Sequence, residues 1–170
     1  MQRHGFLRQT VQVIGELLIT VGVVLLLYVF WQLYWTTFQV QGGMEERIQQ
    51  FQTQTGSPQK PTEVRRTDDP PGVGPVAHGE VFGVLHVPKW GMQIPIAQGT
   101  TPDVLDSGDA GHYPDTQMPG EIGNFALAGH RRTYGNNFRR VDIMEPGDPI
   151  VVETAQAYLV YEVTGHRIVL

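Results

Sequence analysis

The sequence predicts a mainly β domain preceded by one transmembrane α-helix. An apolar segment without charged side chains occupies residues 17–38. From about residue 80 onward, short runs of β-branched and aromatic residues are separated by turns rich in Gly and Pro. Many short strands at close spacing are typical of a β-barrel or a β-sandwich.

We assign residues 11–40 to an anchor helix and residues 1–10 to a cytoplasmic tail. At about 1.5 Å per residue, roughly 20 residues cross the hydrocarbon core of a bilayer. Tyr34 and Trp35 suit an interfacial aromatic belt, and two arginines precede the span. The positive-inside rule then predicts a single-pass cell-membrane protein whose C-terminal domain is extracellular.

Two other interpretations of the apolar segment are weaker. A cleaved signal peptide has a shorter apolar core and a small-residue cleavage site, and no good site follows Trp35. A buried helix of a soluble protein would need a much larger partner core than this chain can build.

Residues 41–79 are interpreted as an extracellular stalk. Gly42 and Gly43 are expected to end or loosen the helix. Residues 55–79 contain five prolines and four glycines without an apolar period, which is typical of a flexible to semi-rigid spacer.

One part of this stalk leaves an alternative open. Residues 45–54 could form a short polar helix with Ile48 and Phe51 on one face. We favour a surface stalk here, because two apolar side chains are a short pattern.

Residues 80–170 are expected to form the β domain. Its predicted strands are 81–87, 93–97, a central strand at 124–128, 149–153 and a long strand or hairpin at 157–170. A brief helix is expected to start at Thr101 as N-cap with Pro102 at its first position. Residues 108–123 read as a long loop, and residues 138–144 as a single helical turn.

His130 is the main candidate for a catalytic residue. Phe125 and Leu127 alternate with small alanines, which indicates a packed strand. Gly129 then lets the backbone turn or approach a neighbour closely, so His130 should stand at the end of a strand. A histidine after a glycine is weak evidence by itself, since most such histidines are solvated or packed.

Several segments in a fixed order add weight to this candidate. They are 79–88, 94–97, 108–114, 118–123, 124–131 and 145–148. From about residue 79 onward the chain resembles the sortases, the membrane-anchored cysteine transpeptidases of Gram-positive bacteria, most closely the class E type of actinobacteria. The resemblance implies a closed β-barrel, and His130 falls where that family keeps its catalytic histidine.

The chain departs from the sortase pattern in one serious respect. Sortases attack with a cysteine on a later strand, followed by an arginine on the next strand. The 170 residues contain no cysteine and end at Leu170, before either element would arrive. Arg131 and Arg132 do not match the family's catalytic arginine. The sequence therefore looks like the front two-thirds of a sortase, with an incomplete barrel whose strand edges are open.

The resemblance also implies a reaction and partners. A thiolate would attack the Thr–Gly bond of an LPXTG-like sorting signal (LAXTG in class E), and a cell-wall amine would resolve the thioacyl intermediate. His130 would be the general acid. By the same resemblance, His112, Tyr113 and Arg131 would line the substrate groove. The expected partners are sorting-signal peptides, a cell-wall peptide amine and the lipid bilayer.

Other kinds of site have little support. A structural role in its loop is more probable for His112 than a groove role. A zinc site of His112 and His130 with Asp109 or Asp115 lacks a compact motif, so we expect no metal and no cofactor. The net charge of −5 falls on residues 80–170, with eleven acidic and six basic residues and no basic stripe with interleaved aromatics. Nucleic acid is therefore not expected as a partner.

Two functional hypotheses follow. In the first, this is a sortase-type transpeptidase truncated before its cysteine and arginine and inactive alone. In the second, it is a catalytically dead, membrane-tethered β domain that binds a partner or has no function. A reading frame downstream of codon 170 that encodes a strand ending in Cys would favour the first.

Overall fold

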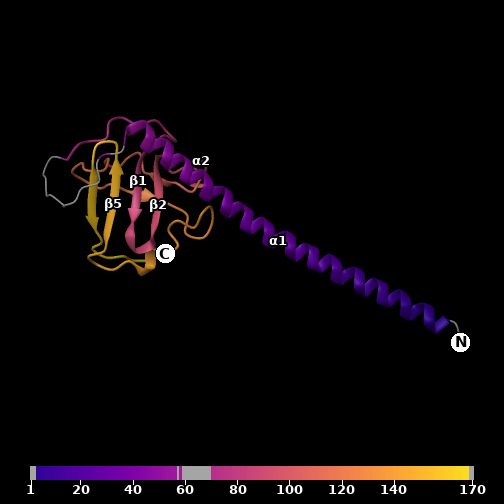
Figure 1. Ribbon diagram of the computed structural model, residues 1–170. Coiled ribbons are helices and arrows are strands. Elements are labelled where there is room, and N and C mark those ends of the chain that lie inside the picture. The colour runs from indigo at the N-terminus through magenta and orange to yellow at the C-terminus, as the bar shows by residue number, and fades with distance from the viewer. Residues whose placement is uncertain (1–2, 57, 59–69, 169–170) are drawn as a thin grey trace. The chain divides into compact units, whose positions relative to one another are not determined.

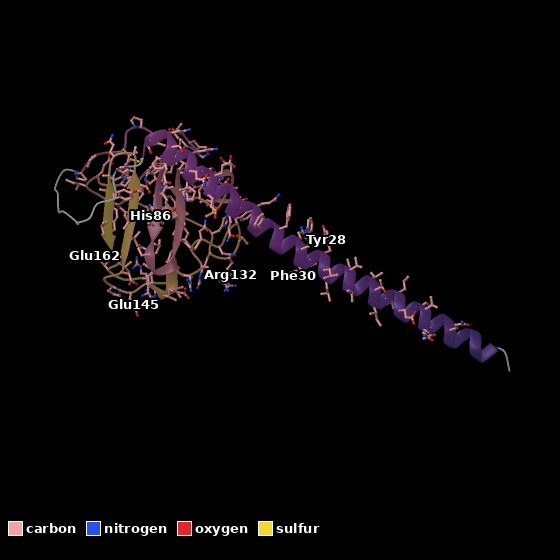
Figure 2. All side chains as sticks on the ribbon, in the orientation of Figure 1. Tyr28, Phe30, His86, Arg132, Glu145 and Glu162 are labelled. Atoms are coloured by element: carbon pink, nitrogen blue, oxygen red, sulfur yellow. The ribbon has the colours of Figure 1, made fainter. Side chains whose placement is uncertain are left out.

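The computed structural model describes residues 3–56, 58 and 70–168, so most of the predicted spacer lies outside the described residues. The chain divides into two compact units, Met1–Thr37 and Phe38–Leu170. Each is considered by itself below. Figures 1 and 2 show the second unit as a β-sheet with loops and a helical segment.

Helix α1 (Arg3–Thr55) contributes to both units. In the first unit, the 22 residues Val11–Gln32 have a mean hydropathy of 2.5, and none of their most apolar window is buried. This part of α1 is therefore long and apolar enough to cross a membrane. The prediction that Gly42 and Gly43 end the helix is wrong, because α1 continues through both. A helical glycine costs only about 1 kcal/mol relative to alanine, and burial of the next turns can offset that cost.

The second unit is built on one six-stranded sheet. Its strands are β1 (Val81–Val87), β2 (Met92–Gln98), β3 (Ala110–His112), β4 (Leu127–Ala128), β5 (Pro149–Thr154) and β6 (Tyr158–Glu162). Their order across the sheet is β4-β3-β2-β1-β5-β6, with β2 and β3 parallel and all other neighbours antiparallel. The sheet forms a half-barrel, which confirms the predicted mainly β, sortase-like fold. Short helices are η1 (Pro88–Trp90), α2 (Pro102–Leu105) and η2 (Val141–Ile143).

Three sequence predictions for this sheet need correction. The segment 124–128 contains only the two-residue strand β4, and it lies at one edge of the sheet rather than in its centre. The segment 108–123 is not all loop, since β3 lies within it. The last strand, β6, is shorter than the predicted 157–170. A strand extends only as far as a neighbouring strand pairs with it. Strand β4 has only β3 as a neighbour, and the two pair over two residues each.

The two faces of the sheet are packed differently. Leu85, Ile94 and Val152 are aligned across β1, β2 and β5 and belong to the main apolar cluster of the inner face. On the outer face, Val84 forms a second buried cluster with Ile48 and Phe51 of α1. Burial of each such side chain contributes about 2 kcal/mol. The stalk interpretation of residues 45–54 is therefore wrong, and the alternative, a helix with one apolar face, is confirmed.

Candidate active site around His130

His130 follows strand β4 and opens the loop that leads to η2, as the sequence predicts. A Cβ atom built on Gly129 would lie 2.1 Å from the ring of Phe138, so only glycine allows this approach. The backbone N–H of Phe138 donates to the carbonyl of His130 at 3.2 Å. The two contacts close the loop and fix where the His130 side chain begins.

The imidazole of His130 forms a pair with a carboxylate. Its Nε2 lies 2.9 Å from Oδ1 of Asp106, and the two side chains are 30% and 40% exposed. Since an ionised carboxylate only accepts hydrogen bonds, Nε2 carries the proton and donates a hydrogen bond to Asp106. The ring of Tyr134 lies beside the imidazole, with 4.9 Å between ring centroids. The arrangement leaves a solvent-accessible imidazole of defined tautomer, which suits proton transfer.

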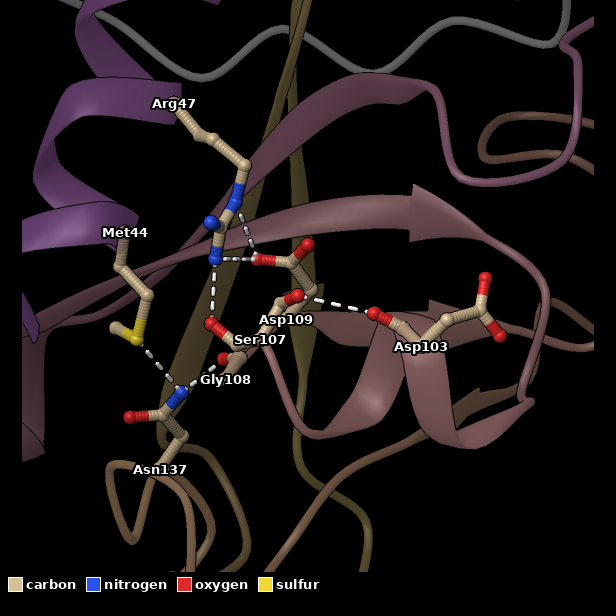
Figure 3. Close-up of polar contacts among 7 residues, drawn as sticks. All are labelled: Met44, Arg47, Asp103, Ser107, Gly108, Asp109 and Asn137. Carbon is tan, nitrogen blue, oxygen red and sulfur yellow. Dashed lines mark hydrogen bonds and ion pairs between the residues drawn. The ribbon is translucent and has the colours of Figure 1, made fainter. Parts of the chain in front are cut away.

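Asp106 belongs to a turn that α1 holds in place. Arg47 of α1 donates from Nη2 and Nε to Oδ1 of Asp109, at 2.8 and 3.1 Å, and also donates to the carbonyl of Ser107. Figure 3 shows these bonds converging on the turn. Asp109 is 4% exposed, and burial raises its pKa although the Arg47 guanidinium acts against that rise. The ionised carboxylate therefore depends on Arg47.

The loop after His130 is anchored to the same turn. Asn137 is 3% exposed, and its Nδ2 donates to the carbonyl of Gly108 and, at 3.2 Å, to the sulfur of Met44. Figure 3 shows Asn137 between α1 and the turn. His130 and Asp106 thus belong to two segments that are tied together at a second, buried point. A pair held at two points keeps its geometry better than two side chains on independent loops.

The other residues expected in a substrate groove occupy different surroundings. His112 is 1% exposed, and its ring is stacked on Phe125. Its Nδ1 lies 2.7 Å from Oε1 of Gln98, and its Nε2 lies 3.0 Å from Oγ1 of Thr116 and near the carbonyl of Gln117. These contacts fit the structural role that the sequence favours for His112.

Tyr113 and Arg131 are both on the surface. Tyr113 is 45% exposed, and the Arg131 guanidinium forms an exposed ion pair with Asp142 at 3.1 Å. Arg131 adjoins His130 in the chain, whereas no contact between His130 and either His112 or Tyr113 is recorded within the described part of the chain. Their place in a substrate groove stays a prediction.

Two partners of the site could not be found from sequence patterns. Asp106 lies 24 positions before His130, and no motif in the sequence links the two residues. Arg47 lies 62 positions before Asp109, in a segment that was interpreted as stalk. No short-range spacing signals either contact.

An apolar cavity of about 310 Å³ opens on the inner face of the sheet. Its lining includes Leu85 of β1, Leu127 of β4 and Val152 of β5. The ring of Phe138, which contacts Gly129, also lines it. The His130 loop therefore borders the interior of the half-barrel.

The fold and the site define a class: a β half-barrel that presents a histidine–carboxylate pair at the end of a strand. The Sortase domain family model matches residues 85–170, half of the chain. The chain belongs to the sortase family, which confirms the resemblance found in the sequence.

Individual relatives agree with this family. The chain is 39% identical over 158 residues to sortase SrtE1 of Streptomyces coelicolor, a match that covers 89% of this chain and 42% of that protein. The SrtA sortase from Actinomyces oris has a similar fold, with a TM-score of 0.58 and 55% identity over 61% of this chain and 60% of that one. Sortase E from Streptomyces avermitilis is similar with a TM-score of 0.51 and 36% identity, over 53% and 60% of the two chains. The chain thus spans less than half the length of SrtE1.

Proposed function

We propose that this chain provides the acid–base part of a membrane-anchored sortase-type transpeptidase. The enzyme cleaves an LPXTG- or LAXTG-like sorting signal and joins the new carboxyl end of the secreted protein to a cell-wall amine. The nucleophilic cysteine and the oxyanion-stabilising arginine come from outside residues 1–170, which contain no cysteine and cannot form a thioacyl intermediate by themselves.

His130 has a defined task in each half of the reaction. When the thiolate attacks the threonine carbonyl, a tetrahedral oxyanion forms and then collapses as the Thr–Gly bond breaks. The protonated His130 gives its proton to the departing glycine amine, leaving the threonine acyl group on sulfur. In the second half, neutral His130 takes a proton from the attacking amine, and the thiolate leaves. Asp106 holds the ring through Nε2 and so keeps its other nitrogen turned toward the reacting groups in both steps.

One observation carries the proposal. In a chain of the sortase family, the histidine that the sequence proposes as catalytic, His130, is partly exposed and has its ring held by a carboxylate. A buried ring could not reach a substrate, as His112 illustrates.

The anchor is part of the same proposal. We assign the span Val11–Gln32 to the cell membrane, with residues 1–10 in the cytoplasm and the β domain outside. A membrane tether suits an enzyme whose protein substrates emerge across the same bilayer. Reporter fusions or protease protection at either end of the span test this orientation, and a cytoplasmic β domain would contradict it.

The proposed function can be tested by supplying the cysteine and the arginine that residues 1–170 do not provide. Residues 1–170 are joined to a C-terminal segment of SrtE1 that carries the family's cysteine and arginine strands, and the fusion is incubated with an LAXTG peptide and an amine acceptor. Mass spectrometry is expected to detect the transpeptidation product. In the fusion, His130→Ala should lower the rate by at least about 100-fold, since a positioned general acid–base contributes that much or more.

A matched control is available in the same chain. His78 pairs with Asp103 at 3.0 Å on the surface, so His78→Ala removes a similar exposed pair and should leave the rate unchanged. Equal losses for the two variants would contradict the role of His130. Turnover by residues 1–170 alone would overturn the thiol mechanism.

The second candidate is a domain without catalysis. It is favoured by the lack of cysteine in the 170 residues. A fusion that unfolds cooperatively but forms no thioacyl intermediate would support it.

A further inference from the structure

The loop that follows His130 forms a pocket lined by arginines. Its cavity of about 500 Å³ is lined by Arg131, Arg132, Asn136, Arg139 and Asp142, and we call it the arginine pocket. Figure 2 shows the side chain of Arg132 projecting from the globular unit. The transpeptidase mechanism proposed above does not use this pocket.

The arginine pocket is a basic site in an otherwise acidic domain. Residues 80–170 contain eleven acidic and six basic side chains, and four of the six basic ones lie within residues 131–140. Such clustering in an acidic domain creates a local positive potential that concentrates anions. The domain as a whole would repel them.

Within residues 3–56, 58 and 70–168, two of the three lining arginines have no side-chain partner. Arg131 is neutralised by Asp142, whereas Arg132 and Arg139 take part in no ion pair or side-chain hydrogen bond recorded among the described residues. The pocket therefore carries two unpaired guanidinium groups. Each can form a bidentate pair with a phosphate or a carboxylate.

The backbone of the loop is set before any ligand arrives. The N–H groups of Asn136 and Arg139 donate to the carbonyls of Thr133 and Asn136, at 3.0 and 2.9 Å. Tyr134 and Asn136 adopt left-handed conformations, with φ of 46° and 56°. Residues other than glycine adopt this conformation where the surroundings impose it, often at ligand sites.

A buried anchor explains how the conformation is imposed. The side chain of Asn137 is held by the carbonyl of Gly108 beneath the loop. Because the backbone is already ordered, binding an anion would fix only the two arginine side chains, which lowers its entropic cost.

We propose that the arginine pocket binds a phosphate-bearing ligand beside His130. Two unpaired guanidinium groups match the two negative charges of a phosphate monoester, whereas a single carboxylate would leave one of them uncompensated. This binding does not require the transpeptidase reaction, so it can be tested without a thiol.

The test is a titration of the full 170-residue chain in a zwitterionic detergent, at constant ionic strength, with methyl phosphate in its dianionic form. Amide resonances are followed by NMR. Residues 131–142 are expected to shift saturably, and Arg132→Ala and Arg139→Ala should each weaken binding by about fivefold, the loss expected for one charge-assisted contact.

Arg140→Ala is the matched control, because Arg140 belongs to the same basic segment but does not line the pocket. It should leave the affinity unchanged. Malonate, a dicarboxylate of the same charge, should bind more weakly than methyl phosphate. The proposal is overturned if no saturable shift occurs, if Arg140→Ala weakens binding as much as the other two, or if malonate binds equally well.

Discussion

His112 is the last residue of β3 and His130 follows the neighbouring strand β4, but the two have opposite surroundings. Strands β3 and β4 pair antiparallel, with His112 opposite Leu127, and His130 lies three positions beyond Leu127. His112 is 1% exposed and has polar partners at both ring nitrogens. The His130 side chain is 30% exposed and has one carboxylate partner.

The difference shows what makes a histidine structural or chemical. A ring stacked on Phe125 with polar partners at both nitrogens has no nitrogen left for a substrate. A ring held at one nitrogen keeps the other for a substrate. The two histidines therefore differ in burial and in the number of polar partners, and only His130 meets the requirements of the catalytic role proposed for it.

The largest expected effect on stability is at His112. His112→Ala should lower the free energy of unfolding by about 3 kcal/mol, because it leaves a cavity and removes hydrogen bonds from Gln98 and Thr116. Thermal unfolding of the full chain, followed by near-ultraviolet circular dichroism, measures the loss. His78→Ala is the surface control, and similar melting temperatures for the two variants would mean that the His112 contacts do not stabilise the fold.

A smaller effect is expected where α1 supports the His130 site. Arg47→Ala should cost about 2 kcal/mol at neutral pH, since it leaves the buried Asp109 carboxylate unpaired. Denaturant unfolding over a range of pH measures it. The turn that carries Asp106 should also become more accessible to proteases.

The pH dependence has a definite sign. Burial already raises the pKa of Asp109, and loss of the Arg47 guanidinium would raise it further. A carboxyl with a raised folded pKa contributes stability that is present below its unfolded pKa and lost as pH rises through the folded value. The deficit of Arg47→Ala should therefore be smallest below about pH 4 and grow as pH rises. Asp109→Asn in the same background should remove this growth, and a deficit that shrinks with rising pH would contradict the pairing.

The smallest expected effect concerns the orientation of the His130 ring. Asp106→Asn keeps a side chain of the same shape but removes the charge, so in the SrtE1 fusion it should lower the rate about tenfold. Both side chains are partly exposed, and unfolding should change little. Nitrogen NMR of the His130 ring gives an independent readout. The proton should sit on Nε2 in the original chain, and the variant should show a mixture of tautomers; an unchanged spectrum and rate would remove Asp106 from the site.

Sequence patterns predicted the parts of the fold that depend on near neighbours. Short runs of β-branched and other apolar residues located β1 and β5, and Pro102 marked the first position of α2. Thr101 stands at the N-cap, but its hydroxyl contacts His78 instead of the helix backbone. Local chemistry thus located the helix without determining how its cap is used.

The errors fall where a distant partner decides the structure. No sequence pattern near Gly42 predicts that Ile48 and Phe51 are buried against Val84. This burial makes the C-terminal end of α1 part of the β domain. Strand β4 was expected to be central because its residues are apolar, yet pairing leaves it at an edge.

The sequence by itself determined the mainly β class, the apolar segment fit to cross a membrane, the family and the position of His130. These properties follow from composition, period and motif order along neighbouring residues. Only the tertiary structure decided that Asp106 holds the imidazole, that Arg47 holds the turn of Asp106, and that His112 is enclosed while His130 stays open. Such contacts join residues tens of positions apart, and burial, which sets the cost of each charge, exists only once the chain has folded.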